Sequence, residues 1–297
     1  MAILIKFAMQ NKKLASHREL SAMKFGKSAI FPRVALIAMA LTFLQAPAFA
    51  WGEVGHQAVA AMAARLLNEP TKQMVQSVLK VRPHDMAMRR NALWASQNPL
   101  RDTPNWHNAS VPPNGGAYDP ARDCPGGSCI VEKVGELRRT IVDPAATADA
   151  RSDAMAYLIN FVADVHIPMN AAGAPGALWI KISDKTQKLN LWWDDAFVRL
   201  IGDEALTISA ILAPKITADQ TKLWSNGTPA DWTNESFAVS RELIARNNLQ
   251  LNAQSGSAEA EAVILTPAAL EDIKTIVAQR LAMAAVRLAW ILNNAGK

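Results

Sequence analysis

Apolar residues recur every three or four positions along most of the chain after residue 50, and this spacing limits the fold more than any other feature. Such a period is typical of helices that bury one face or are wholly enclosed. Plausible capping residues or early prolines precede several of the segments, as at Pro70 and at Thr266-Pro267. The predicted helices cover residues 55–69, 71–81, 130–142, 151–166, 232–248 and 266–294.

The remaining segments predict little other regular structure. Residues 97–127 are rich in Asn, Pro, Gly and Asp, which is typical of a long loop. The best strand candidate is ALWIKIS around Trp179, as one small β-hairpin. No repeat or low-complexity linker interrupts the pattern. The sequence therefore predicts an all-α fold with a single helical domain.

The first fifty residues have the organisation of a secretory signal peptide. Basic residues continue to Arg33, an apolar run follows from Val34, and Ala48-Phe49-Ala50 is a small-x-small cleavage sequence. Cleavage there would make Trp51 the first residue, so we expect a signal peptide over 1–50 and a mature domain over 51–297. A start at Met23 would give a leader of more usual length. The alternative is an uncleaved anchor, but the apolar run is short for a membrane span.

The formal charge of +5 also belongs to this leader. Residues 1–50 carry seven Lys or Arg and one Glu, which leaves the rest of the chain near −1. A nearly neutral body gives no compositional argument for a polyanionic partner. Any nucleic-acid interaction must therefore be argued from a site.

Two cysteines, Cys124 and Cys129, stand in CPGGSC. In an exported chain we expect a disulfide that closes a tight loop, with the intervening proline and glycines forming the turn. The alternative, a two-thiolate metal site, lacks a second pair of cysteines.

Two pairs of polar residues lie inside apolar helical stretches. Asn160 and Asp164 are four positions apart, and so are Asn190 and Asp194, so each pair shares a helix face. Burying an amide or a carboxylate without a partner costs several kcal/mol. The pairs therefore indicate either local hydrogen bonds or a shared polar site. Further candidates are three histidines, each weak when taken singly: His56, His107 and His166. His84 stands in a basic segment that we expect to be exposed.

Several of these motifs, in this order, resemble the zinc-dependent single-strand-specific nucleases, whose all-helical fold is similar to that of bacterial zinc phospholipases C. The resemblance covers essentially the whole mature chain. It is carried by WGEVGHQAVAAMAARLL, LWASQNPLRDTPNWHNASVP, CPGGSCIVEKV, YLINFVADVHIPMN, LNLWWDDAFV, WTNES and QRLAMAAVRLAWILN.

The resemblance implies three zinc ions and nine ligand positions. In that family the amine and carbonyl of a first-residue Trp chelate zinc, so that cleavage of the signal peptide itself creates a ligand. A deprotonated α-amine is a good nitrogen donor for this purpose. The positions that match are Trp51, His56, His107, Asp164 and Asp194, and the positions where a ligand is replaced are Ser96, Asn160, Asn170 and Asn190.

These replacements affect the implied zinc ions unequally. The first would keep only His107 and the shared Asp164, and the second would keep only Asp194. The third alone would stay complete, through Trp51, His56 and Asp164. Because zinc prefers nitrogen and sulfur donors with a carboxylate, neutral amide oxygens are poor replacements.

We therefore expect a secreted or periplasmic homologue of zinc endonucleases that hydrolyse single-stranded nucleic acid and 3′-nucleotides, with a degenerate site, at most one firmly held zinc and impaired activity. One alternative is an active phosphodiesterase that recruits Asn oxygens, nearby carboxylates such as Asp195, and His166 as substitute ligands. Another is a non-catalytic binder of nucleotides or single strands, with bases stacked on Trp106, Trp192 or Trp193.

Overall fold

The computed structural model describes residues 51–98, 104–172, 178–247 and 262–296, and it confirms the all-α class. The predicted signal peptide lies outside the described residues. The helices are α1 (Glu53–Arg65), α2 (Glu69–Leu79), α3 (His84–Asn91), α4 (Trp94–Gln97), α5 (Pro120–Asp123), α6 (Ile130–Val142), α7 (Ala148–Asp164), α8 (Pro168–Ala171), α9 (Leu189–Leu191), α10 (Phe197–Arg199), α11 (Ala205–Leu212), α12 (Ala218–Trp224), α13 (Pro229–Arg246) and α15 (Pro267–Asn293).

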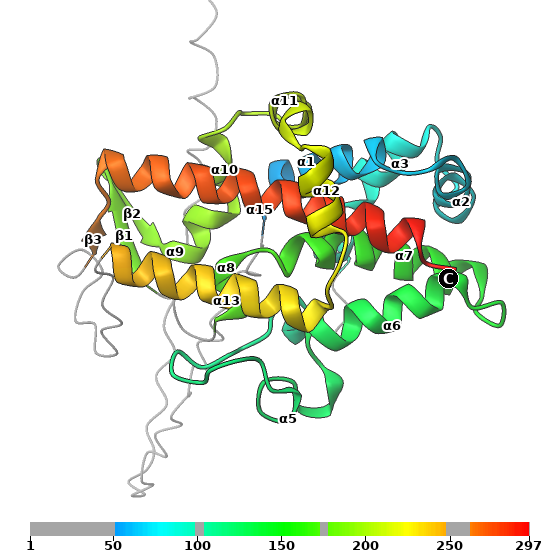
Figure 1. Cartoon of the computed structure of the whole chain (residues 1–297), viewed down its shortest axis with the longest axis horizontal. Helices are drawn as coiled ribbons and strands as arrows, with labels where there is room; N and C mark the ends of the chain where they lie inside the picture. The colour runs from blue at the N-terminus through cyan, green and yellow to red at the C-terminus, as the bar shows by residue number, and fades with distance from the viewer. Residues whose placement is uncertain (1–50, 99–103, 173–177, 248–261, 297) are drawn as a thin grey trace, which may run out of the picture. The chain divides into compact units, whose positions relative to one another are not determined.

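Three helices form the centre of the domain. They bury continuous runs of residues: Ala58–Ala64 in α1, Ala154–Asp164 in α7 and Arg280–Ala289 in α15. A helix that is enclosed on all sides belongs to the core. α15 packs against both α1 and α7, and it crosses the domain as the long orange and red helix of Figure 1.

The other long helices enclose this centre. α6 packs on α7, α13 packs on α6 and α8, and α3 and α11 pack on α1. Threonine caps fix several helix starts, because a hydroxyl accepts an N–H that the first turn would leave without a partner. Thr147, Thr228 and Thr266 serve α7, α13 and α15 in this way.

The predicted loop over 97–127 contains more structure than expected. It includes α5 and two 3₁₀ turns, Pro104–His107 and Pro125–Gly127. Each begins with proline, whose fixed φ suits the first helical position and whose missing N–H costs nothing there. Single turns are too short to produce an apolar period, so the spacing rule does not detect them.

The predicted hairpin is present, and a third strand joins it. β1 (Trp179–Ile182) pairs antiparallel with β2 (Lys185–Lys188), and Trp179 lies opposite Lys188. β3 (Val263–Ile264) pairs with β1 in parallel.

Among the described helices, α15 is long and apolar enough to span a membrane by length and composition. Most of its apolar window is buried inside the domain, as in the core helix of a folded protein.

Candidate metal centre

The segment that precedes α1, Trp51 and Gly52, is folded back into the core. The Trp51 side chain is fully buried, and its indole N–H donates to the carbonyl oxygen of Ala163 at 3.0 Å. The backbone N–H of Gly52 donates to the carbonyl oxygen of Asp194. A methyl group at Gly52 would overlap that oxygen, and one at Gly55 would lie 2.8 Å from Trp51 Cβ. Gly52 therefore allows the backbone beside Trp51 to approach Asp194, and Gly55 allows the first turn of α1, which carries His56, to approach Trp51.

Asp164 joins two of the predicted histidine ligands. It is fully buried at the end of α7, with Oδ1 2.9 Å from His56 Nε2 and Oδ2 2.7 Å from His107 Nδ1. Because an ionised carboxylate only accepts, both ring nitrogens donate. Burial alone would raise the pKa of Asp164, but the two histidines outweigh burial and lower it. We call these three residues the Asp164 cluster.

Asp194 lies close enough to the Asp164 cluster to be affected by its charge. It is carried by a π-helical turn, Trp192–Ala196, between α9 and α10. Burial and the carboxylates of Asp164 and Asp195 raise the pKa of Asp194 to about 8. A π turn is uncommon and often marks a functional position. Sequence spacing does not distinguish it from an ordinary helical turn.

Two of the asparagines at replaced ligand positions make hydrogen bonds to the backbone. The Asn160 amide N–H donates to the carbonyl oxygen of Ala92 at 2.9 Å. The Asn170 amide N–H lies 3.3 Å from the carbonyl oxygen of His107 and 3.4 Å from that of Asp164. Asn170 therefore ties together the chain segments that carry two predicted ligands.

The other two replaced positions differ. The Oδ1 atom of Asn190 is buried and has no hydrogen-bond partner in the described part of the chain. The side chain of Ser96, on α4, lies outside the part that the structure describes.

The arrangement thus brings Trp51, His56, His107 and Asp164 together and places Asp194 nearby. Within the described ranges, no three or more His, Cys, Asp or Glu side chains are grouped so as to hold a metal ion. The side chains at three of the four replaced positions are amides, whose oxygens are hard, neutral and poorly suited to zinc.

The family model for S1/P1 Nuclease matches residues 51–297. The chain belongs to the S1/P1 nuclease family. It is 24% identical to Endonuclease 3 of Arabidopsis thaliana over an alignment of 283 positions that covers 86% of this chain and 92% of the plant protein. It is 25% identical to Nuclease P1 of Penicillium citrinum over 169 residues, 53% of this chain and 62% of the fungal protein. The resemblance seen in the motifs is therefore confirmed, and zinc dependence is a general property of this family.

The structure also shows a second buried polar cluster, which sequence reasoning missed. Arg287 donates to both oxygens of Glu235 at 2.6 and 2.8 Å, and to the Nε2 of His166 at 3.0 Å. Arg280 donates to the His166 carbonyl at 3.0 Å and to the Ser236 hydroxyl. We call these five residues the Arg287 cluster. WTNES and the final apolar helix contain its charged members, but no spacing rule joins residues so far apart in the chain.

The Arg287 cluster decides the state of His166. Its Nδ1 donates to the carbonyl oxygen of Val162 at 2.7 Å, and its Nε2 accepts from Arg287, so both ring nitrogens are occupied. Burial, together with Arg280 and Arg287, holds the pKa of His166 well below its ordinary value. The ring is therefore neutral and has no nitrogen left for a metal.

The other alternative residues are also engaged elsewhere. Asp195 pairs with Arg199 through both carboxylate oxygens, at 2.7 and 2.8 Å. Trp192 and Trp193 are 5% and 1% exposed, so the expectation that bases stack on these two rings is wrong. Trp106 is half-buried, with the ammonium group of Lys133 4.3 Å from its ring centroid.

The cysteine sulfurs of Cys124 and Cys129 lie at bonding distance, 2.09 Å. They close the turn Pro125–Gly127 directly before α6.

Proposed function

We propose that this chain is an exported S1/P1-type nuclease homologue that takes single-stranded nucleic acid or nucleotides and hydrolyses them poorly, because its zinc site is degenerate. Its family membership supports the substrate class. The observation that carries the degeneracy is the donor set around Asp164, in which asparagines stand where the resemblance expects histidines.

The first and second zinc positions do not fit zinc. The first keeps His107 and Asp164 but loses two further donors, at Ser96 and Asn160. Asn160 uses its amide on the backbone of Ala92. The second position keeps Asp194 alone, with Asn170 and Asn190 in place of histidines. Loss of outer partners alone typically costs about 10 to 100-fold in metal affinity or activity, so loss of two direct ligands costs more.

The third position fits one zinc ion chemically. His56 and Asp164 are already in contact, and Trp51 is held beside Asp164 by its bond to Ala163. Signal cleavage after Ala50 would add a free amine at Trp51. An imidazole, a carboxylate and an amine are suitable zinc donors. A zinc ion there would supply Lewis acidity beside Asp164.

The remaining side chains could still orient a substrate. Asp164 accepts a hydrogen bond from His107 Nδ1, which fixes the ring's tautomer and orientation and leaves Nε2 as the basic nitrogen. The His107 side chain is 18% exposed, so this ring reaches solvent whereas His56 does not. We assign His107 the task of holding or accepting a proton at a bound phosphate ester.

Active phosphodiesterase chemistry through substitute ligands is less well supported. It needs additional donors near Asp164 and Asp194. Neutral Asn oxygens are poor zinc donors, and the other two candidates are engaged elsewhere. His166 has both nitrogens hydrogen-bonded, and Asp195 is paired with Arg199.

Export and the disulfide belong to the same proposal. A cleavable leader makes Trp51 the first residue, and an oxidising compartment favours the bond between Cys124 and Cys129.

The first test measures zinc per chain by elemental mass spectrometry, on protein whose N-terminus is confirmed as Trp51. We expect one zinc or none. Two or three tightly held ions would overturn the degenerate site, because the chain would then have found substitute ligands.

A second test restores the expected ligands in one variant, Ser96→Asp/Asn160→His/Asn170→His/Asn190→His. Cleavage of single-stranded DNA and bound zinc should both rise above the parent chain. A folded variant that binds more zinc but cleaves no faster would contradict the proposal. If crowding at buried Asn160 prevents folding, the variant without the Asn160 change gives the same comparison at the second zinc position.

A further inference from the structure

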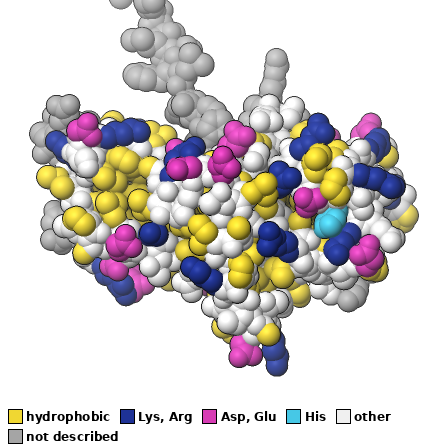
Figure 2. All heavy atoms as spheres, turned by 90° about the horizontal axis from the view of Figure 1, so that it is seen from above, with side chains coloured by type: hydrophobic (Ala, Val, Ile, Leu, Met, Phe, Trp, Pro, Cys, Tyr) yellow, Lys and Arg dark blue, Asp and Glu magenta, His cyan; other side chains and the backbone are white. Residues whose placement is uncertain are grey.

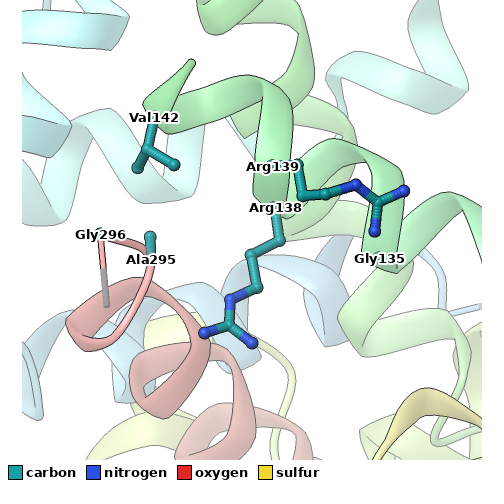
Figure 3. Close-up of a pocket in the computed structure, with 6 residues that line it drawn as sticks. All are labelled: Gly135, Arg138, Arg139, Val142, Ala295 and Gly296. Carbon is teal, nitrogen blue, oxygen red and sulfur yellow. The ribbon is translucent and has the colours of Figure 1, made fainter. Parts of the chain in front are cut away.

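Two of the cavities in the described part of the chain lie outside the candidate metal centre, and they differ in the arrangement of their polar groups. One, of about 560 Å³, lies between α6 and the C-terminal residues (Figure 3). Arg138 there donates to the carbonyl oxygen of Asn294 at 2.9 Å. Arg139 extends away from Ala295 in Figure 3, so the two guanidinium groups do not converge on a common ligand.

The second cavity, of about 280 Å³, lies between α1, α3 and α11. Its polar lining residues are Arg65, His84, Asp85, Arg89 and Ser209, and apolar atoms of Ala61, Ala64 and Leu206 complete the wall. Figure 2 views the domain from the side that carries α11 and shows basic side chains close to a histidine on this face. We call it the α11 cavity.

Two buried donors at the α11 cavity lack a partner. Ser209 is fully buried, and its hydroxyl has no hydrogen-bond partner in the described structure. The Nε of Arg89 is also buried and has none among the described residues. A buried polar group without a partner is costly, so a site that retains two calls for an explanation. A ligand that accepts hydrogen bonds would satisfy both.

The charge of the cavity selects an anion. Arg65 and Arg89 bring two guanidinium groups, against the single carboxylate of Asp85, which lies 3.7 Å from Arg89. The Nε2 of His84 lies 3.3 Å from the carbonyl oxygen of Ala64, a contact in which the ring donates. Planar guanidinium groups and a hydroxyl donor together suit the oxygens of a phosphate group.

We propose that the α11 cavity binds a phosphate group, either inorganic phosphate or the terminal phosphate of a nucleotide. The site is separate from the Asp164 cluster. Arg65 lies nine positions after His56 on α1, which at 1.5 Å per residue is about 14 Å along the helix. We therefore expect binding at the α11 cavity not to require zinc. The proposed phosphate site and the proposed nuclease function can each be wrong without affecting the other.

Isothermal titration of the processed full chain tests this, with inorganic phosphate and thymidine 5′-monophosphate as separate probes, each with and without a chelator. The chelator removes any phosphate binding that depends on metal. The variants are Arg89→Gln and Ser209→Ala, and Arg139→Gln on α6 is the matched control that removes the same charge elsewhere.

We expect one phosphate per chain, and binding that persists in chelator. Arg89→Gln should weaken it by about 10-fold or more, and Ser209→Ala by about 5-fold, as for the loss of a charge-assisted and an ordinary hydrogen bond. Arg139→Gln should leave the affinity unchanged. If only thymidine 5′-monophosphate binds and the variants weaken its binding as described, the ligand is a nucleotide. If inorganic phosphate and thymidine 5′-monophosphate bind equally, the phosphate group alone is recognised.

Thermal unfolding separates a ligand role from a structural one. Since Ser209 donates to no residue in the described structure, Ser209→Ala should not lower the midpoint without phosphate, but should reduce the upward shift that phosphate causes. The proposal is overturned if neither inorganic phosphate nor thymidine 5′-monophosphate binds at about 10 mM, a weak-affinity limit. It is also overturned if both variants bind phosphate as the parent does, or if binding disappears with the chelator.

Discussion

The Asp164 cluster and the Arg287 cluster begin two residues apart at the end of α7, yet they are built differently. In the Arg287 cluster the buried guanidinium groups face a carboxylate, a hydroxyl, an imidazole nitrogen and backbone carbonyls. In the Asp164 cluster a single carboxylate accepts from two histidines. The Oδ1 atom of Asn190, four positions before Asp194, is buried and has no hydrogen-bond partner among the residues that the structure describes.

This difference distinguishes a polar cluster that stabilises the fold from one that is a candidate binding site. A polar network whose donors and acceptors match strengthens the fold, whereas a buried group left without a partner is expensive. The Arg287 cluster joins the end of α7 to α13 and α15 and thereby holds the chain on which Asp164 lies. The Asp164 cluster instead joins three residues that the resemblance predicts as ligands, through the two hydrogen bonds that Asp164 accepts.

The largest expected effect is at Glu235. Glu235→Ala leaves the guanidinium groups of Arg280 and Arg287 buried, each 3% exposed in the side chain, without their carboxylate. Removing one partner of a buried ion pair costs about 3–5 kcal/mol, and because Glu235 is itself 40% exposed we expect the lower end, about 3 kcal/mol. Urea unfolding measures the loss.

The matched control for Glu235 is Glu242→Ala on the same helix. Glu242 pairs with Arg246, and both side chains are more than half exposed. A surface pair of this kind contributes about 0–1 kcal/mol. Equal losses for the two variants would show that the Arg287 cluster is no more important to the fold than a surface ion pair.

Asp164→Asn should have the next largest effect. The amide keeps the size of the carboxylate but removes its charge, and it cannot accept from His56 and His107 with both ends. Loss of charge-assisted bonds gives about 2 kcal/mol of destabilisation in urea, measured in chelator so that zinc does not contribute. Asp195→Asn, which breaks an exposed pair with Arg199, should cost little, and a similar loss there would remove the distinction.

The apolar period predicted the helices, whereas the resemblance to the nuclease family implied which residues would be ligands. The helical period identified α7 and α15, and the order of motifs brought Trp51, His56, His107 and Asp164 into one site. Whether these residues bind metal stays a prediction.

The partners of the polar residues could not be predicted in the same way. Four-residue spacing placed Asn160 and Asp164 on one face, but Asn160 donates to Ala92, in another helical segment. Glu235 and Arg287 are 52 positions apart and meet only because α13 and α15 are brought together by the fold. A period of apolar residues identifies a buried face, but it does not specify which helix covers that face.

A smaller effect is expected at the glycine that brings the segment before α1 against the π turn. Gly52→Ala would place a methyl group against the carbonyl oxygen of Asp194 and force the backbone apart. Overpacking of this kind costs about 1–3 kcal/mol, and we expect about 1–2 kcal/mol because the segment before α1 can shift. Bound zinc should fall as well, since Trp51 would move.

Gly135→Ala in α6 is the control of opposite sign. A methyl group there meets only the Arg139 side chain, at an ordinary distance of 3.6 Å. Alanine is favoured over glycine within a helix by about 1 kcal/mol, so this variant should be more stable than the parent. A loss at both positions would indicate that the effect at Gly52 is not specific to the approach to Asp194.

The smallest effect should be at Asn190. Its Oδ1 atom is buried and makes no hydrogen bond within the described chain, so Asn190→Ala removes an unsatisfied acceptor and should change the stability by less than about 0.5 kcal/mol. Asn160→Ala is the matched comparison, because it strips the buried carbonyl of Ala92 of its donor and should cost about 1–3 kcal/mol. Urea unfolding of both variants in chelator gives the difference. If Asn190→Ala costs as much stability as Asn160→Ala, then Asn190 stabilises the fold as Asn160 does. The contrast between the region around Asp194 and the Arg287 cluster would then be lost.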